Sequence, residues 1–299
     1  MFPISSHMRA VLQALFVTLL WSSSWVLIKQ GLEDIHALTF AGLRYTLAFV
    51  CLLPLAARRG DLRTLRTLSR RDWRTLAALG LVYYTVTQGA QFLGLERLPA
   101  VTTSLLLSFS PVMVALLGIV LLGERITGAQ WGGIALYLAG VLVYFYPVNI
   151  PAREVAGLVI VLVGVLANAI AAVMGRSINR RRTLSPLAVT VASMGVGSLA
   201  LLAAGATTGG VPALGAQSWA IIIFLAVVNT AFAFTLWNHT QRTLSAIETS
   251  VINNTMLIQI AILAWISLGE RLGARAIFGL ALAAAGTLIV QLRRPRTSV

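Results

Sequence analysis

Leu122-Gly123-Glu124-Arg125 and Leu268-Gly269-Glu270-Arg271 are two copies of one tetrapeptide, and each copy closes an apolar run of helical length. The two glutamates lie 270 − 124 = 146 positions apart, which is close to half of the 299 residues. This spacing predicts that the chain consists of two copies of one structural unit. If each unit crosses a membrane an odd number of times, the copies must point in opposite directions through the bilayer, as in many transporters.

The composition is that of an integral membrane protein. Apolar residues make up 58% of the chain, charged residues make up 11%, and the mean hydropathy is +0.86. An average soluble domain carries about 25% charged residues. Because about 20 apolar residues in a helix cross the hydrocarbon layer, we count about ten candidate spans. They cover residues 10–29, 36–57, 74–94, 99–121, 129–146, 154–174, 186–205, 217–237, 245–267 and 273–292.

The net charge of +14 would suggest nucleic-acid binding in a soluble domain, since basic patches attract phosphate. Its distribution excludes that class. With the N-terminus in the cytoplasm, 17 basic residues fall on the cytoplasmic side and five outside. The five are Lys29, Arg97, Arg153, Arg271 and Arg275. This positive-inside bias predicts a multi-pass protein of the bacterial inner (plasma) membrane with both termini in the cytoplasm.

Two other features narrow the class of protein. The first span is too long for a signal peptide, and Trp21 to Trp25 offers no small-x-small cleavage site, so we expect a retained helix. The single cysteine, Cys51, lies inside the second span. It has no partner cysteine, so neither a disulfide nor a cysteine metal site is expected.

The repeat extends well beyond the tetrapeptide. Residues 98–145 aligned on 244–291 without a gap give 16 identities, including Thr103 with Thr249 and Ser104 with Ser250. We therefore predict an all-α integral membrane protein of ten transmembrane helices in two inverted five-helix repeats. The repeats are expected at 1–147 and 152–299, joined by a short linker from Pro147 to Pro151 outside the membrane.

Several motifs resemble those of a known family. They are Leu98-Pro99-Ala100-Val101-Thr102-Thr103-Ser104, Ser110-Pro111-Val112, Leu122-Gly123-Glu124-Arg125, Leu20-Trp21-Ser22-Ser23-Ser24-Trp25 with Lys29, and Arg44 in the second span. The pattern resembles the EamA family of the drug/metabolite transporter superfamily, and within it the YddG-type exporters of aromatic and other neutral amino acids. The resemblance implies ten spans, a central cavity reached from either side, and efflux of small metabolites. Since Leu257 replaces Pro111 in the second copy, we do not expect equivalent contacts from the two halves.

Polar residues within spans are the best pointer to a transport pathway, because polar groups in hydrocarbon need partners or a wet cavity. Helical spacing predicts one stripe of Tyr84, Gln88 and Gln91, and another of Ser104, Ser108 and Pro111. The repeat partners of the second stripe are Ser250, Asn254 and Leu257. The predicted substrate-binding residues are Trp21, Trp25, Tyr84, Gln88, Gln91, Ser108, Pro111, Asn168, Asn229 and Asn254.

Each of these residues also has a structural interpretation. Serine, threonine and asparagine commonly hydrogen-bond between membrane helices, and we favour that packing role for Ser104 and Ser250. Cavity lining is favoured for Gln88, Gln91 and Asn254. For Asn168 and Asn229 both roles stay open, as do a static kink and a hinge for Pro111.

The charged residues are assigned mainly structural roles. Arg44 cannot lose its charge and needs an acceptor. Pairing with helix carbonyls or a glutamate is favoured over binding a substrate carboxylate. We expect the two Glu-Arg pairs to cap turns. Because no titratable group is securely placed at a span centre, facilitated diffusion or exchange is favoured over proton antiport.

These observations predict a transporter, not an enzyme, that alternates access of its central cavity and exports neutral metabolites. An exporter of another amphipathic or drug-like compound, and a passive channel, are alternatives. A lipid transferase would need clustered carboxylates for Mg²⁺, whereas Asp34, Asp61 and Asp72 are isolated in loops. No phosphate-binding glycine loop is present, and no cofactor or metal is expected. The expected partners are the small-molecule substrate and the bilayer, with a monomer as the working assembly.

Overall fold

The computed structural model describes residues 6–122, 127–147, 151–180, 184–210, 213–240, 243–244 and 246–292. Within these ranges the regular structure is entirely helical, as the composition predicted. Glu124 and Arg125 of the first tetrapeptide and residues 148–150 of the predicted linker lie outside the described residues.

Six described helices are long and apolar enough to cross a membrane. They are α1 (Ser6–Gly31), α2 (Ala37–Arg58), α8 (Gly128–Phe145), α9 (Ala152–Arg180), α10 (Pro186–Thr208) and α13 (Ala246–Leu268). Each coincides with one of the spans predicted from hydropathy. A seventh apolar helix, α14 (Ala274–Leu292), coincides with the last predicted span.

The other three predicted spans are interrupted. The third consists of α4 (Arg70–Gly80), the π-helix η1 (Leu81–Gln88) and α5 (Gly89–Arg97). The fourth is broken between α6 (Ala100–Leu107) and α7 (Ser110–Leu122). The eighth consists of α11 (Ala216–Ala226), the π-helix η2 (Val227–Phe232) and α12 (Ala233–Thr240). Hydropathy therefore did not predict these interruptions, and membrane crossing by these three segments stays a prediction.

The two π-helical turns occupy equivalent positions in the predicted repeats, because Val227 and Leu81 are 227 − 81 = 146 residues apart. In each turn a threonine hydroxyl donates to a carbonyl five residues earlier, from Thr87 to Val82 at 3.0 Å and from Thr230 to Leu225 at 2.9 Å. Such turns are rare and often lie at functional sites. Since η1 contains Tyr84 and Gln88, the α-helical spacing assumed for their stripe does not hold there.

By packing, the chain divides into two compact units that do not follow the sequence repeats. The first unit comprises Met1–Leu27, Leu98–Leu158 and Phe232–Val299, and the second comprises Ile28–Arg97 and Val159–Ala231. Each unit contains segments from both 1–147 and 152–299. Helices α1 and α9 contribute to both units.

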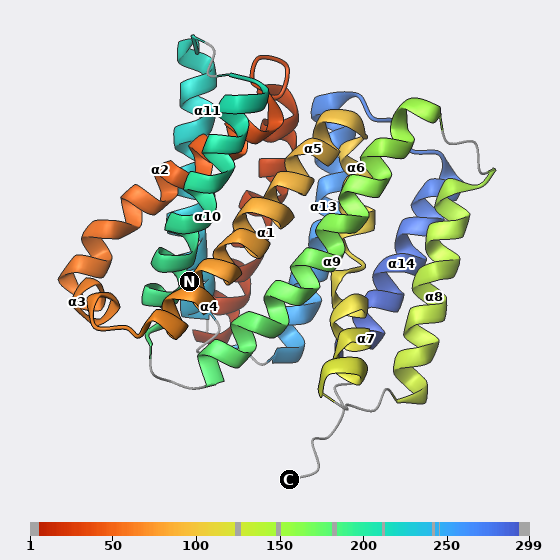
Figure 1. The fold of residues 1–299 in the computed structure, drawn as a ribbon. Coiled ribbons are helices and arrows are strands. Elements are labelled where there is room, and N and C mark those ends of the chain that lie inside the picture. The colour runs from red at the N-terminus through yellow and green to blue at the C-terminus, as the bar shows by residue number, and fades with distance from the viewer. Residues whose placement is uncertain are drawn as a thin grey trace, which may run out of the picture. The chain divides into compact units, whose positions relative to one another are not determined.

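In the first unit, α8 and α14 lie side by side (Figure 1). A Cβ atom on Gly133 would meet the carbonyl of Gly286 at 2.9 Å, and one on Gly140 would meet the carbonyl of Gly279 at 2.6 Å. Because the earlier glycine of α8 meets the later glycine of α14, the helices run antiparallel. The missing side chains let the two backbones approach closely.

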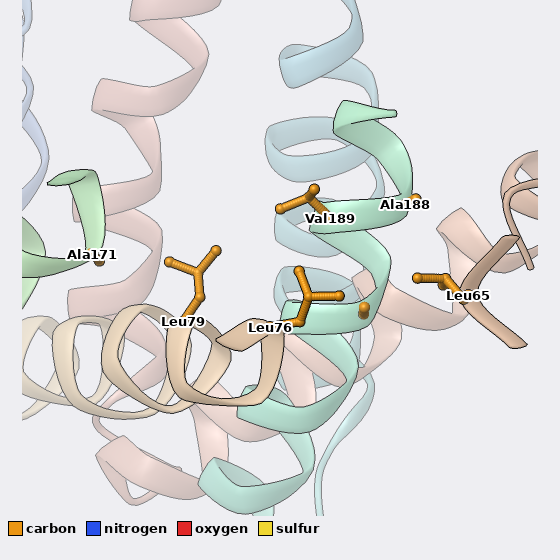
Figure 2. Packing of buried hydrophobic residues seen from close by; sticks show 7 residues of the cluster. Leu65, Leu76, Leu79, Ala171, Ala188 and Val189 are labelled. Carbon is orange, nitrogen blue, oxygen red and sulfur yellow. The ribbon is translucent and has the colours of Figure 1, made fainter. Parts of the chain in front are cut away.

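In the second unit, α2 and α10 also pack antiparallel, with Gly42 of α2 against Leu202 of α10 and Gly205 of α10 against Thr39 of α2. The short helix α3 (Asp61–Arg66) follows α2 after Gly60, whose φ of 78° favours glycine. Apolar side chains from four helices then form one cluster (Figure 2). The labelled members are Leu65 of α3, Leu76 and Leu79 of α4, Ala171 of α9, and Ala188 and Val189 of α10.

Candidate functional site

Arg44 of α2 is a buried cation in the second unit. Its side chain is only 6% exposed. The guanidinium carbon lies 5.1 Å from the ring centre of Tyr45 and 6.0 Å from that of Phe92. Phe92 is itself fully buried and packs edge-on against Phe40. The positive charge therefore lies in an aromatic environment.

The structural acceptor that the sequence favoured for Arg44 is absent from the described part of the chain. The guanidinium makes no ion pair or hydrogen bond there, and its buried Nε atom has no acceptor. Aromatic faces stabilise a desolvated cation by about 2 kcal/mol, whereas the effective penalty for burying an ion is several kcal/mol. The rings therefore offset only part of that penalty, and Arg44 can still accept an anion.

Next to Arg44, a hydrogen-bonded aromatic group joins α2 to η1. The Tyr45 hydroxyl donates to Oε1 of Gln88 at 2.6 Å, and both side chains are buried. The Tyr84 ring lies 5.5 Å from that of Tyr45 and 4.8 Å from that of Tyr83. The π-helical turn thus supplies both Tyr84 and Gln88, two of the predicted binding residues, to the same group as Arg44.

The structure places the remaining predicted residues of this unit as follows. Gln91 on α5 and Asn168 on α9 are half-buried, and neither makes a side-chain hydrogen bond to a described residue. Asn229 is fully buried within η2. Their assignment to substrate binding stays a prediction.

In the first unit, the predicted tryptophans lie on α1. The Trp21 ring is 5.1 Å from that of Trp237 and 5.2 Å from that of Phe234. Trp25 is 7% exposed. Trp21, Phe234 and Trp237 thus form an aromatic cluster between α1 and α12.

A polar network that sequence reasoning missed joins α1 to α13. The Gln259 amide accepts from Ser22 Oγ at 2.9 Å and donates to Thr18 Oγ1 at 3.2 Å and to Thr255 Oγ1 at 3.0 Å. The amide oxygen of Gln259 thus accepts one hydrogen bond, and its amide nitrogen donates two, all to residues of the same unit. Its position inside an apolar span was the available signal. Asn254, one residue before Thr255, differs because its buried Nδ2 atom has no acceptor among the described residues.

The fourth span breaks between Leu107 and Ser110, and Pro111 is the second residue of α7. Proline cannot donate to the carbonyl four residues earlier, and that carbonyl, of Leu107, accepts the Ser110 hydroxyl at 2.8 Å. Ser108 donates to the Leu105 carbonyl of its own helix at 2.6 Å. The kink or hinge considered for Pro111 is therefore a helix break, and the Leu107 carbonyl is partnered locally.

The second tetrapeptide has the capping role predicted for it. The Glu270 carboxylate accepts from the amides of Ala100 at 2.7 Å and Val101 at 3.2 Å, at the first turn of α6. A carboxylate here partners otherwise unbonded amides and faces the positive end of the helix dipole. The corresponding role of Glu124 lies outside the described residues.

Carboxylates in the second unit are dispersed. Asp34 accepts from Ser218 Oγ at 3.1 Å, and Asp61 accepts from Ser185 Oγ at 2.6 Å. Among the described residues, no group of three or more His, Cys, Asp or Glu side chains is arranged to hold a metal ion.

Comparisons with known proteins agree with this architecture. The model of the EamA-like transporter family matches residues 8–146 and 155–292. A "Probable terminal-alkyne amino-acid exporter" of Streptantibioticus cattleyicolor is 27% identical over 95% of this chain and 94% of its own length. An S-adenosylmethionine/S-adenosylhomocysteine transporter of Chlamydia trachomatis is 34% identical over 42% of this chain, a match that spans only 37% of that relative.

An uncharacterized transporter of Archaeoglobus fulgidus is 26% identical over 95% of this chain and 99% of its own length. A solved crystal structure, 19% identical in sequence, shares the fold with a TM-score of 0.66 and covers 95% of this chain and 98% of its own. The two family matches together cover most of the chain. The protein is therefore a multi-pass membrane transporter that belongs to the EamA-like transporter family.

Proposed function

We propose that the protein exports small neutral metabolites, chiefly aromatic and other neutral amino acids, and alternates access of their binding site between the two sides of the inner membrane. The observation that carries this proposal is Arg44, a buried cation without a counter-charge among the described residues. A transported carboxylate would supply that charge.

The surroundings of Arg44 suit an amino acid. A guanidinium binds a carboxylate through two parallel hydrogen bonds, which fixes the orientation of the ligand. The faces of Tyr45 and Tyr84 can hold an apolar side chain or the ammonium group. The carboxylate of a zwitterion can pair with Arg44 while its ammonium group lies on an aromatic face, so each charge of the ligand finds a partner.

The names of two relatives support the same chemistry. One relative is named for an amino acid and the other for S-adenosylmethionine and S-adenosylhomocysteine. All of these compounds carry an α-amino carboxylate. The YddG-like specificity for aromatic side chains is part of our proposal and draws on the ring-lined surroundings of Arg44.

Alternating access requires a two-part architecture, and we include ten crossings in two inverted repeats in the proposal. Supporting it, the four glycines at the contact between α8 and α14 are related by the repeat offset, since 279 − 133 = 146 and 286 − 140 = 146. The two π-helical turns share this offset. The ends of the two family matches also differ by 292 − 146 = 146 residues. We place both termini in the cytoplasm.

An exporter of a larger amphipathic metabolite is the second candidate. The cluster of Trp21, Phe234 and Trp237 favours it, because three adjacent rings offer more apolar contact than a small amino acid needs. For coupling, we propose facilitated diffusion or exchange.

The test is flux of a labelled panel of neutral amino acids in proteoliposomes, with and without a proton gradient. We expect saturable flux of labelled phenylalanine. Unlabelled phenylalanine should compete with it, whereas phenethylamine, which lacks the carboxylate, should not. Arg44→Gln and Arg44→Lys are compared with Arg97→Gln, a control at the exposed end of α5. We expect both Arg44 variants to lose flux, since lysine does not reproduce the bidentate contact.

Two results would overturn the proposal in different ways. If no amino acid moves and none competes, the substrate class is wrong. If phenethylamine competes as well as phenylalanine, Arg44 is not the carboxylate site, although the protein still transports.

A further inference from the structure

The second unit contains an apolar groove of about 380 Å³ at the end of α2 that carries the short helix α3. The groove lies between α2, α3, α4 and α10. Its lining is Phe49, Leu53, Leu62, Leu65, Arg66, Trp73, Val191, Ala192, Gly195, Val196 and Leu199. Arg66 is the one charged residue of this lining. The groove is separate from Arg44 and from every predicted substrate-binding residue.

Specific contacts hold the walls of the groove in place. Leu65 anchors α3 because it is buried in the cluster with Leu76 and Ala188 (Figure 2). The Trp73 indole donates to the Leu65 carbonyl at 3.1 Å, and this bond ties the start of α4 to α3. Gly195 leaves room beside the Phe49 ring, which a Cβ atom would approach to 2.9 Å. The apolar side of α3 is thereby held over a recess between two long helices.

The lining of the groove combines exposed apolar side chains with one exposed cation, Arg66. Leu199 is 54% exposed, which is typical of a side chain that faces lipid in a membrane helix. Trp73 is 37% exposed, and tryptophan is enriched at the level of lipid headgroups. A molecule that fills the groove would therefore have a long apolar part and a head near Arg66.

The charge around this head position is strongly positive. Residues 58–74 contain seven arginines and two aspartates, a balance of 7 − 2 = +5. The arginines are Arg58, Arg59, Arg63, Arg66, Arg70, Arg71 and Arg74, all exposed and without ion pairs among the described residues. Asp61 instead accepts from Ser185, and Asp72 accepts from Ser69 at the cap of α4. Neither aspartate is bonded to the arginines.

We propose that this groove binds an anionic glycerophospholipid, with an acyl chain along the apolar lining and the phosphate on Arg66. Charge complementarity selects an anionic over a zwitterionic headgroup, because exposed arginines attract anionic lipid. The apolar recess distinguishes this site from a merely basic surface. The bound lipid holds α3 and the start of α4 against α10. This inference does not depend on the transported substrate.

The test uses the purified full-length protein in detergent, titrated with phosphatidylglycerol or phosphatidylcholine of identical acyl chains. Native mass spectrometry counts bound lipid, and the thermal midpoint reports stabilisation. We expect phosphatidylglycerol to bind more tightly and to raise the midpoint. Inorganic phosphate forms a third arm, because binding of phosphate alone at equal strength would mean an anion site without a lipid chain and would overturn the proposal.

Two variants and one control distinguish the contribution of the lipid headgroup from that of the acyl chain. Arg66→Gln removes the lining cation and is expected to weaken phosphatidylglycerol binding about fivefold, the effect of one arginine near an anionic headgroup. Arg63→Gln is the matched control, since it removes one exposed arginine of α3 that does not line the groove. Leu199→Trp narrows the groove and leaves every arginine in place, and it should weaken binding as well.

The outcomes are distinct. Equal weakening by Arg66→Gln and Arg63→Gln would mean diffuse attraction to the arginines, and equal binding of both lipids would remove the charge selection. Either result overturns the site. If Arg66→Gln fails to fold, Leu199→Trp decides the question alone, because unchanged binding in that variant would exclude the groove.

Discussion

The buried polar groups of the two compact units differ in one respect. In the first unit, Gln259 joins Thr18, Ser22 and Thr255 in a network that uses the oxygen and the nitrogen of its amide. In the second unit, Arg44 carries a full charge and has only aromatic faces against it among the described residues. Both sets lie within apolar helices, yet only the first is satisfied.

This difference teaches how to separate packing from binding in a membrane protein. A satisfied network between helices contributes to stability and leaves no group for a ligand. A buried charge without a counter-charge is costly, and it is retained where a ligand or ion supplies that counter-charge. This contrast gives Gln259 a structural role between α1 and α13, and it supports our proposal that Arg44 binds the substrate.

The largest expected effect is that of Arg44→Met. Replacing a buried charge by an apolar side chain of similar volume is often neutral or stabilising by about 1–4 kcal/mol. We expect the thermal midpoint in detergent to stay equal or rise while amino-acid flux falls at least about tenfold, the loss that corresponds to one charged hydrogen-bonded contact. A lower midpoint together with proportional loss of expression would make Arg44 structural and remove the contrast between the units.

Gln259→Leu tests the other side of the comparison. The variant leaves the hydroxyls of Thr18, Ser22 and Thr255 without the amide, so we expect a loss of about 1–3 kcal/mol in the free energy of unfolding. The ranking of substrates in competition assays should stay the same. A change in that ranking with unaltered stability would place the network in the binding site.

Gln88→Ala tests the hydrogen bond between Tyr45 and Gln88 in the second unit. It removes the acceptor of the Tyr45 hydroxyl beside Arg44, and we expect flux to fall about fivefold, in line with one neutral hydrogen bond of about 1 kcal/mol. Gln30→Ala, an exposed glutamine of α1, is the matched control. Flux is normalised to folded protein measured by size-exclusion chromatography, and an equal loss of folded protein and flux would mean a packing role.

Asn254→Ala has the smallest expected effect. Its Nδ2 is the exception in the first unit because it has no acceptor among the described residues. If this amide contacts the substrate, its loss should lower flux about two- to threefold, with the midpoint unchanged. Unaltered flux would leave the first unit entirely structural and make the comparison between the units stronger.

Much of the fold was predictable from the sequence because membrane insertion is decided by local composition. Seven of the predicted spans are seen as long or moderately long apolar helices, and the capping role of Glu270 was anticipated. The interruptions at η1 and η2 were not predicted, because a π-helical turn does not change hydropathy, whereas a kink or hinge at Pro111 was expected. Ten crossings in two inverted repeats remain a prediction.

The candidate site was predicted in part. Gln88 and Tyr84 were singled out as large polar groups inside an apolar span, and the structure brings them to the same group as Arg44. For Arg44 the sequence favoured a structural acceptor over a substrate carboxylate, and no such acceptor lies among the described residues. Gln259 was missed because its partners on α1 lie 237 and 241 residues away in sequence.

The sequence by itself determined that this protein is apolar, internally repeated and membrane-embedded, and it predicted that most basic residues lie at one membrane face. Those properties follow from local composition, charge distribution and internal similarity. Only the tertiary structure decided which polar groups are satisfied and where α3 covers an apolar groove. The physical reason is that a hydrogen bond or an ion pair depends on a few ångströms between helices from distant parts of the chain, a distance that no local pattern of residues specifies.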